Sequence, residues 1–277
     1  MKKIALTLSA ATLVCITVSA QMTTMTSKNG HEVLPQEGDY SISMDAVPLV
    51  NMALNAFDIM NDNGNNAVHP SYVTGFDQTI VGKRFNSATS ANRVRISIAH
   101  SDSTMRMFTP TFDDQGNVTG ENEDVAKSRS TDILIGYGNE FRRGHNRLQG
   151  LYGYEGMLAF GSSSTKNKYG SDLAVGQTRE LSSKDGASFG IGARGFVGAE
   201  YFFAPKMSIG AEFGWSLGIS KTGRGKVENE TNTNGTIETE ETEGGMSQGN
   251  WGFEVDNGGG ATILGGGTAA LTLNLHF

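Results

Sequence analysis

Apolar and polar residues alternate most regularly between positions 188 and 219. The alternation pauses at Ala204-Pro205-Lys206 and then resumes from Met207 to Ile219. One face of each half is almost entirely apolar, whereas the other carries glycine, serine and isolated charges, interrupted by Phe196 and Phe202. A period of two residues is typical of a β-strand, so this stretch predicts two antiparallel strands joined by a tight turn.

The length of the second strand indicates its environment. At about 3.3 Å per residue, Met207 to Ile219 spans roughly 40 Å, enough for a tilted strand to cross the ~25 Å apolar band of an outer membrane. Strands of soluble proteins are usually shorter. We therefore expect the apolar face to contact lipid and the polar face to line an interior. A soluble β-sandwich predicts the opposite, with the Trp215 face packed inside.

Six further segments show strand patterns, so the whole chain predicts about eight strands. Long connections follow strands one, three, five and seven, and short ones follow strands two, four and six. Outer-membrane barrels have short periplasmic turns and long outer loops, and an even strand number places both termini in the periplasm. We predict an all-β, antiparallel transmembrane β-barrel over 39–277, with outer loops at about 47–75, 101–127, 161–186 and 221–260. The six segments are 40–44, 78–85, 93–100, 131–141, 149–160 and 262–277.

A change of period after the first strand predicts a short helix over 48–60. Apolar residues recur there at three- and four-residue spacing after Pro48. Such a helix packs against the barrel wall or in its mouth, or it docks a protein partner.

The N-terminus predicts a signal peptide over 1–20. Lys2 and Lys3 precede an apolar run, and Val18-Ser19-Ala20 supplies the small residues that signal peptidase requires. The only cysteine, Cys15, lies inside this run, so the mature chain is expected to have no thiol. Residues 21–38 are polar and unpatterned, and we expect a mobile periplasmic lead there.

Composition narrows the classes of partner. The net charge of −7 argues against a nucleic-acid-binding protein, which would show a basic face. The acidic, Thr- and Asn-rich segment 228–243 has too few apolar residues to fold alone.

Alternation also assigns side chains to the two faces of the barrel. The interior of an eight-stranded barrel is just wide enough for side chains to fill it, and buried opposite charges are expected to pair. We predict a salt-bridged plug, with a narrow gated channel or proton path as the alternative. The predicted interior charges are Arg93, Arg95, Asp132, Glu140, Glu155, Arg194, Glu200 and Glu212. The predicted lipid-facing residues are Tyr152, Tyr154, Tyr201, Phe203, Phe213, Trp215, Leu273 and Leu275.

Catalytic and metal-binding patterns are weak. His100 with Ser101 and Ser103 is the one nearby His and Ser combination, and no carboxylate can be assigned to orient it. The Asn61 to Asn66 loop lacks the bidentate Glu of a calcium site, and the other histidines, His31, His69, His145 and His276, show no metal-ligand spacing. We predict no cofactor and no metal.

The C-terminal Leu271-Thr272-Leu273-Asn274-Leu275-His276-Phe277 resembles the terminal strand of the small bacterial outer-membrane β-barrels, such as OmpX and the transmembrane domain of OmpA. The hairpin around 200–206 is similar to theirs as well. The resemblance implies an outer-membrane location, contact with outer-membrane lipid, and recognition of Phe277 by the barrel assembly machinery. The 48–60 helix and the long acidic segment depart from this pattern, and no peptidoglycan-binding domain follows the barrel.

These observations favour a non-enzymatic outer-membrane barrel with a filled lumen. It would act through its surface loops, in an interaction or in envelope structure. The alternative is transport, either as a small-solute channel or as an accessory subunit of an outer-membrane transport or secretion complex docking through the 48–60 helix. A third hypothesis is an outer-membrane lipid hydrolase.

Overall fold

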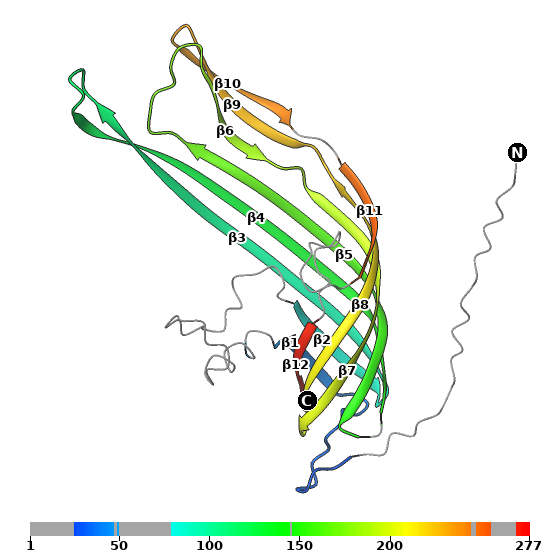
Figure 1. Ribbon diagram of the computed structural model, residues 1–277. Coiled ribbons are helices and arrows are strands. Elements are labelled where there is room, and N and C mark those ends of the chain that lie inside the picture. Colours follow the sequence, from blue (N-terminus) through cyan, green and yellow to red (C-terminus); the bar gives the residue numbers. More distant parts are fainter. Residues whose placement is uncertain (1–24, 47–48, 50–78, 145, 245–247, 256–269) are drawn as a thin grey trace, which may run out of the picture.

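Every regular element of the described chain is a β-strand, and every strand pair is antiparallel. The computed structural model describes residues 25–46, 49, 79–144, 146–244, 248–255 and 270–277. Its strands, labelled in Figure 1, are β1 (Tyr40–Asp45), β2 (Thr79–Ser87), β3 (Ser90–Phe112), β4 (Val118–Arg143), β5 (Leu148–Lys168), β6 (Thr178–Lys184), β7 (Ser188–Ala204), β8 (Met207–Thr222), β9 (Gly225–Thr233), β10 (Thr236–Gly244), β11 (Gln248–Val255) and β12 (Ala270–His276).

Eight of these strands close into a ring in the order β1, β2, β3, β4, β5, β7, β8 and β12. The ring closes where β12 pairs with β1, and the backbones of Tyr40 and Phe277 exchange two hydrogen bonds of 2.8 and 2.9 Å there. All eight predicted strands are present in this ring. The last of them is described only from Ala270.

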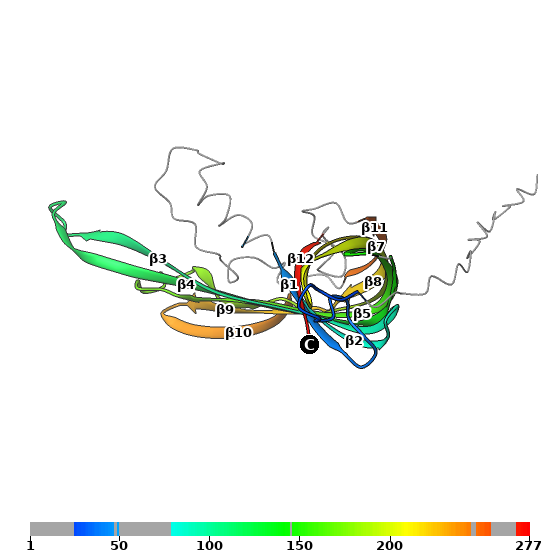
Figure 2. The same cartoon turned by 90° about the horizontal axis from the view of Figure 1, so that it is seen from below.

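The ring does not end evenly, because β3, β4 and β5 continue well past it. They join β6, β9 and β10 in an open sheet with the order β3, β4, β5, β6, β9 and β10. We call this part, residues 99–131, 162–168, 178–184, 225–233 and 236–244, the extension sheet. Figures 1 and 2 show it rising from one side of the ring, away from the C-terminus.

The extension sheet corrects the loops predicted over 101–127, 161–186 and 221–260. Strand pairing continues through most of these segments, from His100 opposite Thr131 to Phe112 opposite Val118 in the first of them. Their residues include many threonines, which favour strands, and Lys226 of β9 lies opposite Glu243 of β10. Backbone pairing with a neighbouring strand therefore orders segments that have few apolar residues. The predicted 47–75 loop and 48–60 helix lie outside the described residues, apart from Leu49.

Burial in the ring is inverted relative to a soluble protein. Most large apolar side chains of the ring point outward, and one outward row runs across six neighbouring strands through pairs of the strand register. The predicted lipid-facing residues on β5, β7 and β8 are all exposed, and Leu273 and Leu275 are half-buried. Trp215 is 39 % exposed, so the β-sandwich expectation of an inward Trp215 face is wrong. The aliphatic row comprises Ile80, Ile96, Ile135, Leu158, Ile191 and Ile219.

The described part of the N-terminal lead is packed rather than mobile. Val33 and Leu34 are buried against Phe202 at the ring end that carries the short turns. The Lys206 amide donates to the Val33 carbonyl at 3.2 Å, and Lys206 also pairs with Asp39. Two apolar residues in a polar segment are enough to anchor it, because Phe202 offers them a buried apolar partner.

None of the described residues forms a helix that is long and apolar enough to cross a membrane.

Candidate functional site

The interior of the ring holds a network of charged side chains contributed by seven strands. They point inward because side chains alternate between the two faces of each strand. Arg93 and Arg95, for example, lie on the inward face of β3, whereas Val94 and Ile96 lie on its outward face. We call the following residues the lumen network: Lys83, Arg93, Arg95, Glu140, Arg142, Glu155, Arg194, Glu200, Glu212 and His276.

Glu212 of β8 is the residue that joins most of the lumen arginines. Its carboxylate lies 2.7 Å from Arg93 Nη1, 2.9 Å from Arg95 Nη2 and 2.6 Å from Arg194 Nη1. Glu155 of β5 contacts the same three arginines, at 3.2, 2.8 and 3.2 Å. Each of these guanidinium groups therefore meets at least two carboxylates, which offsets the cost of burying its charge.

Two further carboxylates extend the network toward the short turns. Glu140 lies 2.8 Å from Lys83 Nζ and 2.9 Å from Arg142 Nε. Glu200 accepts hydrogen bonds from Arg142 and Ser208, and it lies 3.0 Å from His276 Nε2. These side chains are almost completely buried.

Aromatic rings fill the space between the charges. Arg93 lies 4.0 Å above the ring centroid of Phe196, and Arg142 lies 4.7 Å above that of Phe85. Inward glycines make room for these groups: a Cβ atom on Gly153 would lie 2.6 Å from the Phe196 ring, and one on Gly214 would lie 2.7 Å from the Arg194 guanidinium. The polar face of the strands is rich in glycine because the ring is too narrow for a side chain at every inward position.

Most of the predicted interior charges meet in this network, but Asp132 does not. It lies eight residues from Glu140 on β4, exposed at the rim of the ring. The prediction missed Lys83, Arg142 and His276. Arg142 lies just past the predicted fourth strand, which ends at 141, although it is two residues from the inward Glu140 and therefore on the same face. The alternation of side chains along their strands also places His276 and Lys83 on the inward face.

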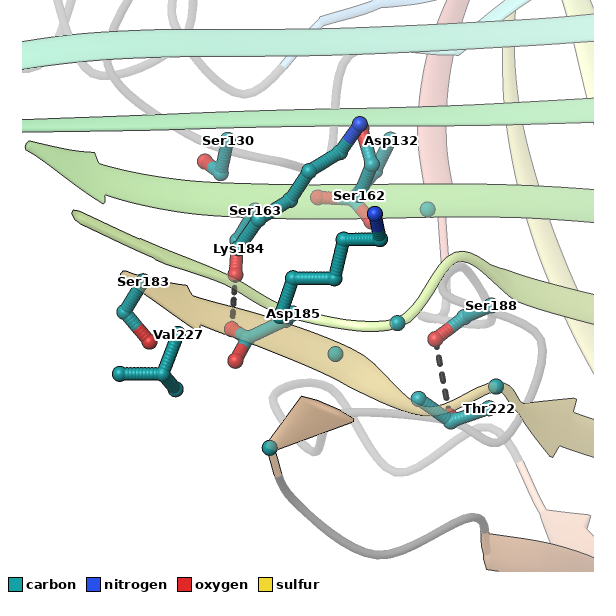
Figure 3. Close-up of a pocket in the computed structure, with 16 residues that line it drawn as sticks. Ser130, Asp132, Ser162, Ser163, Ser183, Lys184, Asp185, Ser188, Thr222 and Val227 are labelled. Carbon is teal, nitrogen blue, oxygen red and sulfur yellow. Dashed lines mark hydrogen bonds between the residues drawn. The ribbon is translucent and has the colours of Figure 1, made fainter. Parts of the chain in front are cut away.

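Asp132 instead lines a pocket at the rim, which we call the rim pocket. It lies where β5 exchanges one partner strand for another: Gly161 pairs with Ser188 of β7, and Ser164 pairs with Lys184 of β6. The pocket has a volume of about 420 Å³. Figure 3 shows six hydroxyl-bearing residues around it, Ser130, Ser162, Ser163, Ser183, Ser188 and Thr222.

Close backbone contacts join two connections at this fork in the sheet. A Cβ atom on Gly186 would lie 1.9 Å from the Gly223 carbonyl oxygen, so the two connections touch through backbone alone. The Asp185 carboxylate accepts a hydrogen bond from Ser163, and the Ser188 and Thr222 hydroxyls are 2.9 Å apart.

The extension sheet combines exposed ion pairs with exposed apolar residues. Arg129 Nη2 donates to Asp102 at 2.7 Å, and this hydrogen bond holds the pKa of the Asp102 carboxyl below its usual value. A hydrogen bond to Glu241 raises the pKa of Lys226. Near the far end of the β3 and β4 hairpin, large apolar side chains are more than half exposed: Met105, Met107, Phe108, Phe112 and Val118.

The predicted His and Ser combination is not assembled. His100 Nδ1 lies 2.9 Å from the Thr131 hydroxyl on the outward face of the hairpin. Ser101 and Ser103 occupy alternate positions and therefore lie on the opposite face. Within the described ranges, no three His, Cys, Asp or Glu residues are grouped so that they could hold a metal ion.

Comparison of the chain with protein-family models, curated proteins and solved structures gave no match.

Proposed function

We propose that this chain is a bacterial outer-membrane β-barrel protein that is not an enzyme. Its lumen is filled by its own charged side chains, and it acts through the extension sheet in surface interactions. The burial pattern of the ring carries this proposal: its isoleucines, tyrosines and Trp215 point outward, while the arginines and glutamates of the lumen network are buried inside. With lipid around the ring, the outward apolar face would be in an apolar medium while the inward charges pair with one another. Water around the ring would leave the apolar face exposed to it.

Closure of the ring supports the membrane assignment. In lipid every backbone polar group must find a protein partner, and a closed antiparallel ring provides one without leaving an edge. Phe277 supports the assembly role proposed for it, because it is 64 % exposed and therefore accessible to another protein. Its ring stacks on Tyr40 at a centroid distance of 6.4 Å, next to the closing strand pair.

The orientation follows from the lengths of the connections. The short turns and the C-terminus lie at one end of the ring, and the extension sheet rises at the other. If short turns face the periplasm, as in other outer-membrane barrels, the extension sheet stands outside the cell.

The extension sheet has the properties of an interaction surface. Among the described residues, the edge of β3 from Ile98 onward has no second neighbouring strand. Unpaired edges and clustered exposed apolar side chains are both typical of protein contact sites. Partners are therefore expected at this sheet. Docking through the 48–60 helix concerns residues outside those described.

The alternative is a small-solute channel. Three buried oxygens near the β1 and β12 seam, Ser41 Oγ, Ser43 Oγ and Asn274 Oδ1, have no hydrogen-bond partner among the described residues, which favours some water in the lumen. The lumen network argues against ion flow, because its ion pairs link strands on all sides of the ring.

Cysteine labelling of intact cells tests the proposed location and orientation. The mature chain is expected to have no thiol, so Thr104→Cys in the extension sheet and Asn146→Cys in a short turn each introduce a single label site. We expect a membrane-impermeant maleimide to label Thr104→Cys on intact cells and Asn146→Cys only after the outer membrane is permeabilised.

The reverse pattern would contradict the orientation. Equal labelling of both variants in soluble extracts, with none in the membrane fraction, would contradict the membrane assignment itself.

A further inference from the structure

The rim pocket has no part in the lumen network or in the proposed contact surface, and its chemistry suits a ligand of its own. Its volume of about 420 Å³ lies in the range of small-molecule sites, roughly 300–1,000 Å³. Small-molecule sites are frequent in the mouths of β-barrels, and this pocket lies at the mouth of a closed ring. Gly186 and Gly223, whose backbones are in contact, are among the residues that line it.

The charges of the rim pocket are balanced. Two carboxylates, Asp132 and Asp185, and two ammonium groups, Lys184 and Lys226, line it together with the six hydroxyls, and Lys226 also pairs with Glu241 outside the lining. An anionic ligand would meet both carboxylates, and a cationic ligand would meet both lysines. A neutral ligand avoids both repulsions.

The hydrogen-bonding groups point to a particular class of neutral ligand. Carboxylates only accept, ammonium groups only donate, and hydroxyls do both. A ring of vicinal hydroxyls, each a donor and an acceptor, can satisfy such a mixture. No aromatic ring is among the residues that line the pocket, so it lacks the stacking surface that nucleobases use.

Asp132 is the group in the pocket that is available to a ligand. No hydrogen bond or ion pair joins its carboxylate to another described residue, whereas Asp185 is held by Ser163. Gly161 lies directly beside it on β5, and a Cβ atom there would lie 2.6 Å from Asp132 Oδ1. The absence of a side chain at position 161 leaves the carboxylate free to face the pocket.

We propose that the rim pocket binds one neutral sugar unit, with the Asp132 carboxylate accepting hydrogen bonds from its hydroxyls and the surrounding serines completing the contacts. This assignment does not rest on the membrane location, because the pocket is formed by the fold alone. In the proposed orientation the pocket opens on the outer side, where it would meet carbohydrate of the cell surface or its surroundings.

Titration calorimetry of the refolded full mature chain tests the proposal. The probes are the methyl glycosides of glucose, galactose, mannose and N-acetylglucosamine, with glucuronate and glucose 6-phosphate as charged comparators. We expect at least one neutral glycoside to bind. Asp132→Asn is expected to weaken that binding about tenfold or more, because a charged hydrogen-bond acceptor is lost. Gly161→Val is expected to abolish it by filling the pocket.

Asp102→Asn is the matched control, since Asp102 is an exposed aspartate on the outward face of the neighbouring strand. It is expected to bind like the parent. The proposal is wrong if no neutral glycoside binds, if Asp132→Asn binds as tightly as the parent, or if a charged comparator binds more tightly than every neutral probe. Should Gly161→Val fail to fold, Asp132→Asn alone decides. A soluble protein that binds a neutral glycoside would refute the membrane assignment and leave this site intact.

Discussion

Replacing Glu212 with glutamine is expected to lower the free energy of unfolding by about 3–5 kcal/mol, the usual cost of removing one partner from a buried ion pair. Glu212 contacts Arg93, Arg95 and Arg194 at 2.6 to 2.9 Å, so the substitution leaves three buried guanidinium groups with less compensating charge. Glutamine preserves the shape of the side chain and isolates the effect of its charge. Urea unfolding of the refolded protein in lipid vesicles, followed by tryptophan fluorescence, measures the change.

Glu241→Gln is the matched control. Glu241 pairs with Lys226 on the extension sheet, and both side chains are more than half exposed. We expect no measurable change in unfolding for this variant, because exposed ion pairs contribute little. Equal effects at the two positions would contradict the role of the lumen network. Single-channel recording adds a second readout: a silent parent agrees with a filled lumen, whereas steady current in the parent supports the channel alternative.

An arginine at Val197 is expected to destabilise the membrane-inserted protein by about 2–4 kcal/mol, the cost of a cation near the bilayer midplane on the lipid face of a barrel. Val197 lies near the middle of the outward apolar run of β7, paired with Tyr152 and Phe213. It is 43 % exposed and makes no contact with the lumen network, so the effect would come from its surroundings. Unfolding titrations in vesicles, together with the yield of folded protein, measure it.

Val118→Arg makes the same change at the far end of the extension sheet, where Val118 is 63 % exposed. We expect it to leave both the yield and the unfolding free energy unchanged, because that position is in water. If Val197→Arg were equally harmless, the outward apolar face could not be in lipid.

The ring could be predicted from the sequence because alternation at every second residue shows where a strand lies and which of its side chains share a face. Arg95 and Glu155 illustrate this. The alternation of side chains along their strands places both inside the ring, where they meet at 2.8 Å. Sequence distance gave no information about which charges would meet. Glu212 and Arg93 are far apart in the chain, and the closed ring brings them together.

The errors of prediction have specific causes. The sequence pattern ends the fourth strand at 141 and so leaves out Arg142, although β4 continues through Arg143. The alternation of the strand places Asp132 on the inward face, but it lies closer to the rim than the lumen network does. The height of a residue along the ring axis depends on the stagger between strands, which a sequence pattern does not reveal. The sequence predicts loops where the extension sheet lies, because these segments have few apolar residues to bury. Its strands are ordered by their neighbours instead, as at Glu230, which pairs with Arg179 of β6.

The central claim, that the outward apolar face lies in lipid, is tested most directly by the fluorescence of Trp215. The chain has two tryptophans, so a Trp251→Phe variant leaves Trp215 as the sole reporter. We predict that lipids brominated along their acyl chains strongly quench this fluorescence in the refolded protein, whereas aqueous acrylamide quenches it weakly. Efficient quenching by acrylamide with none by brominated lipid would contradict the account, because Trp215 would then face water.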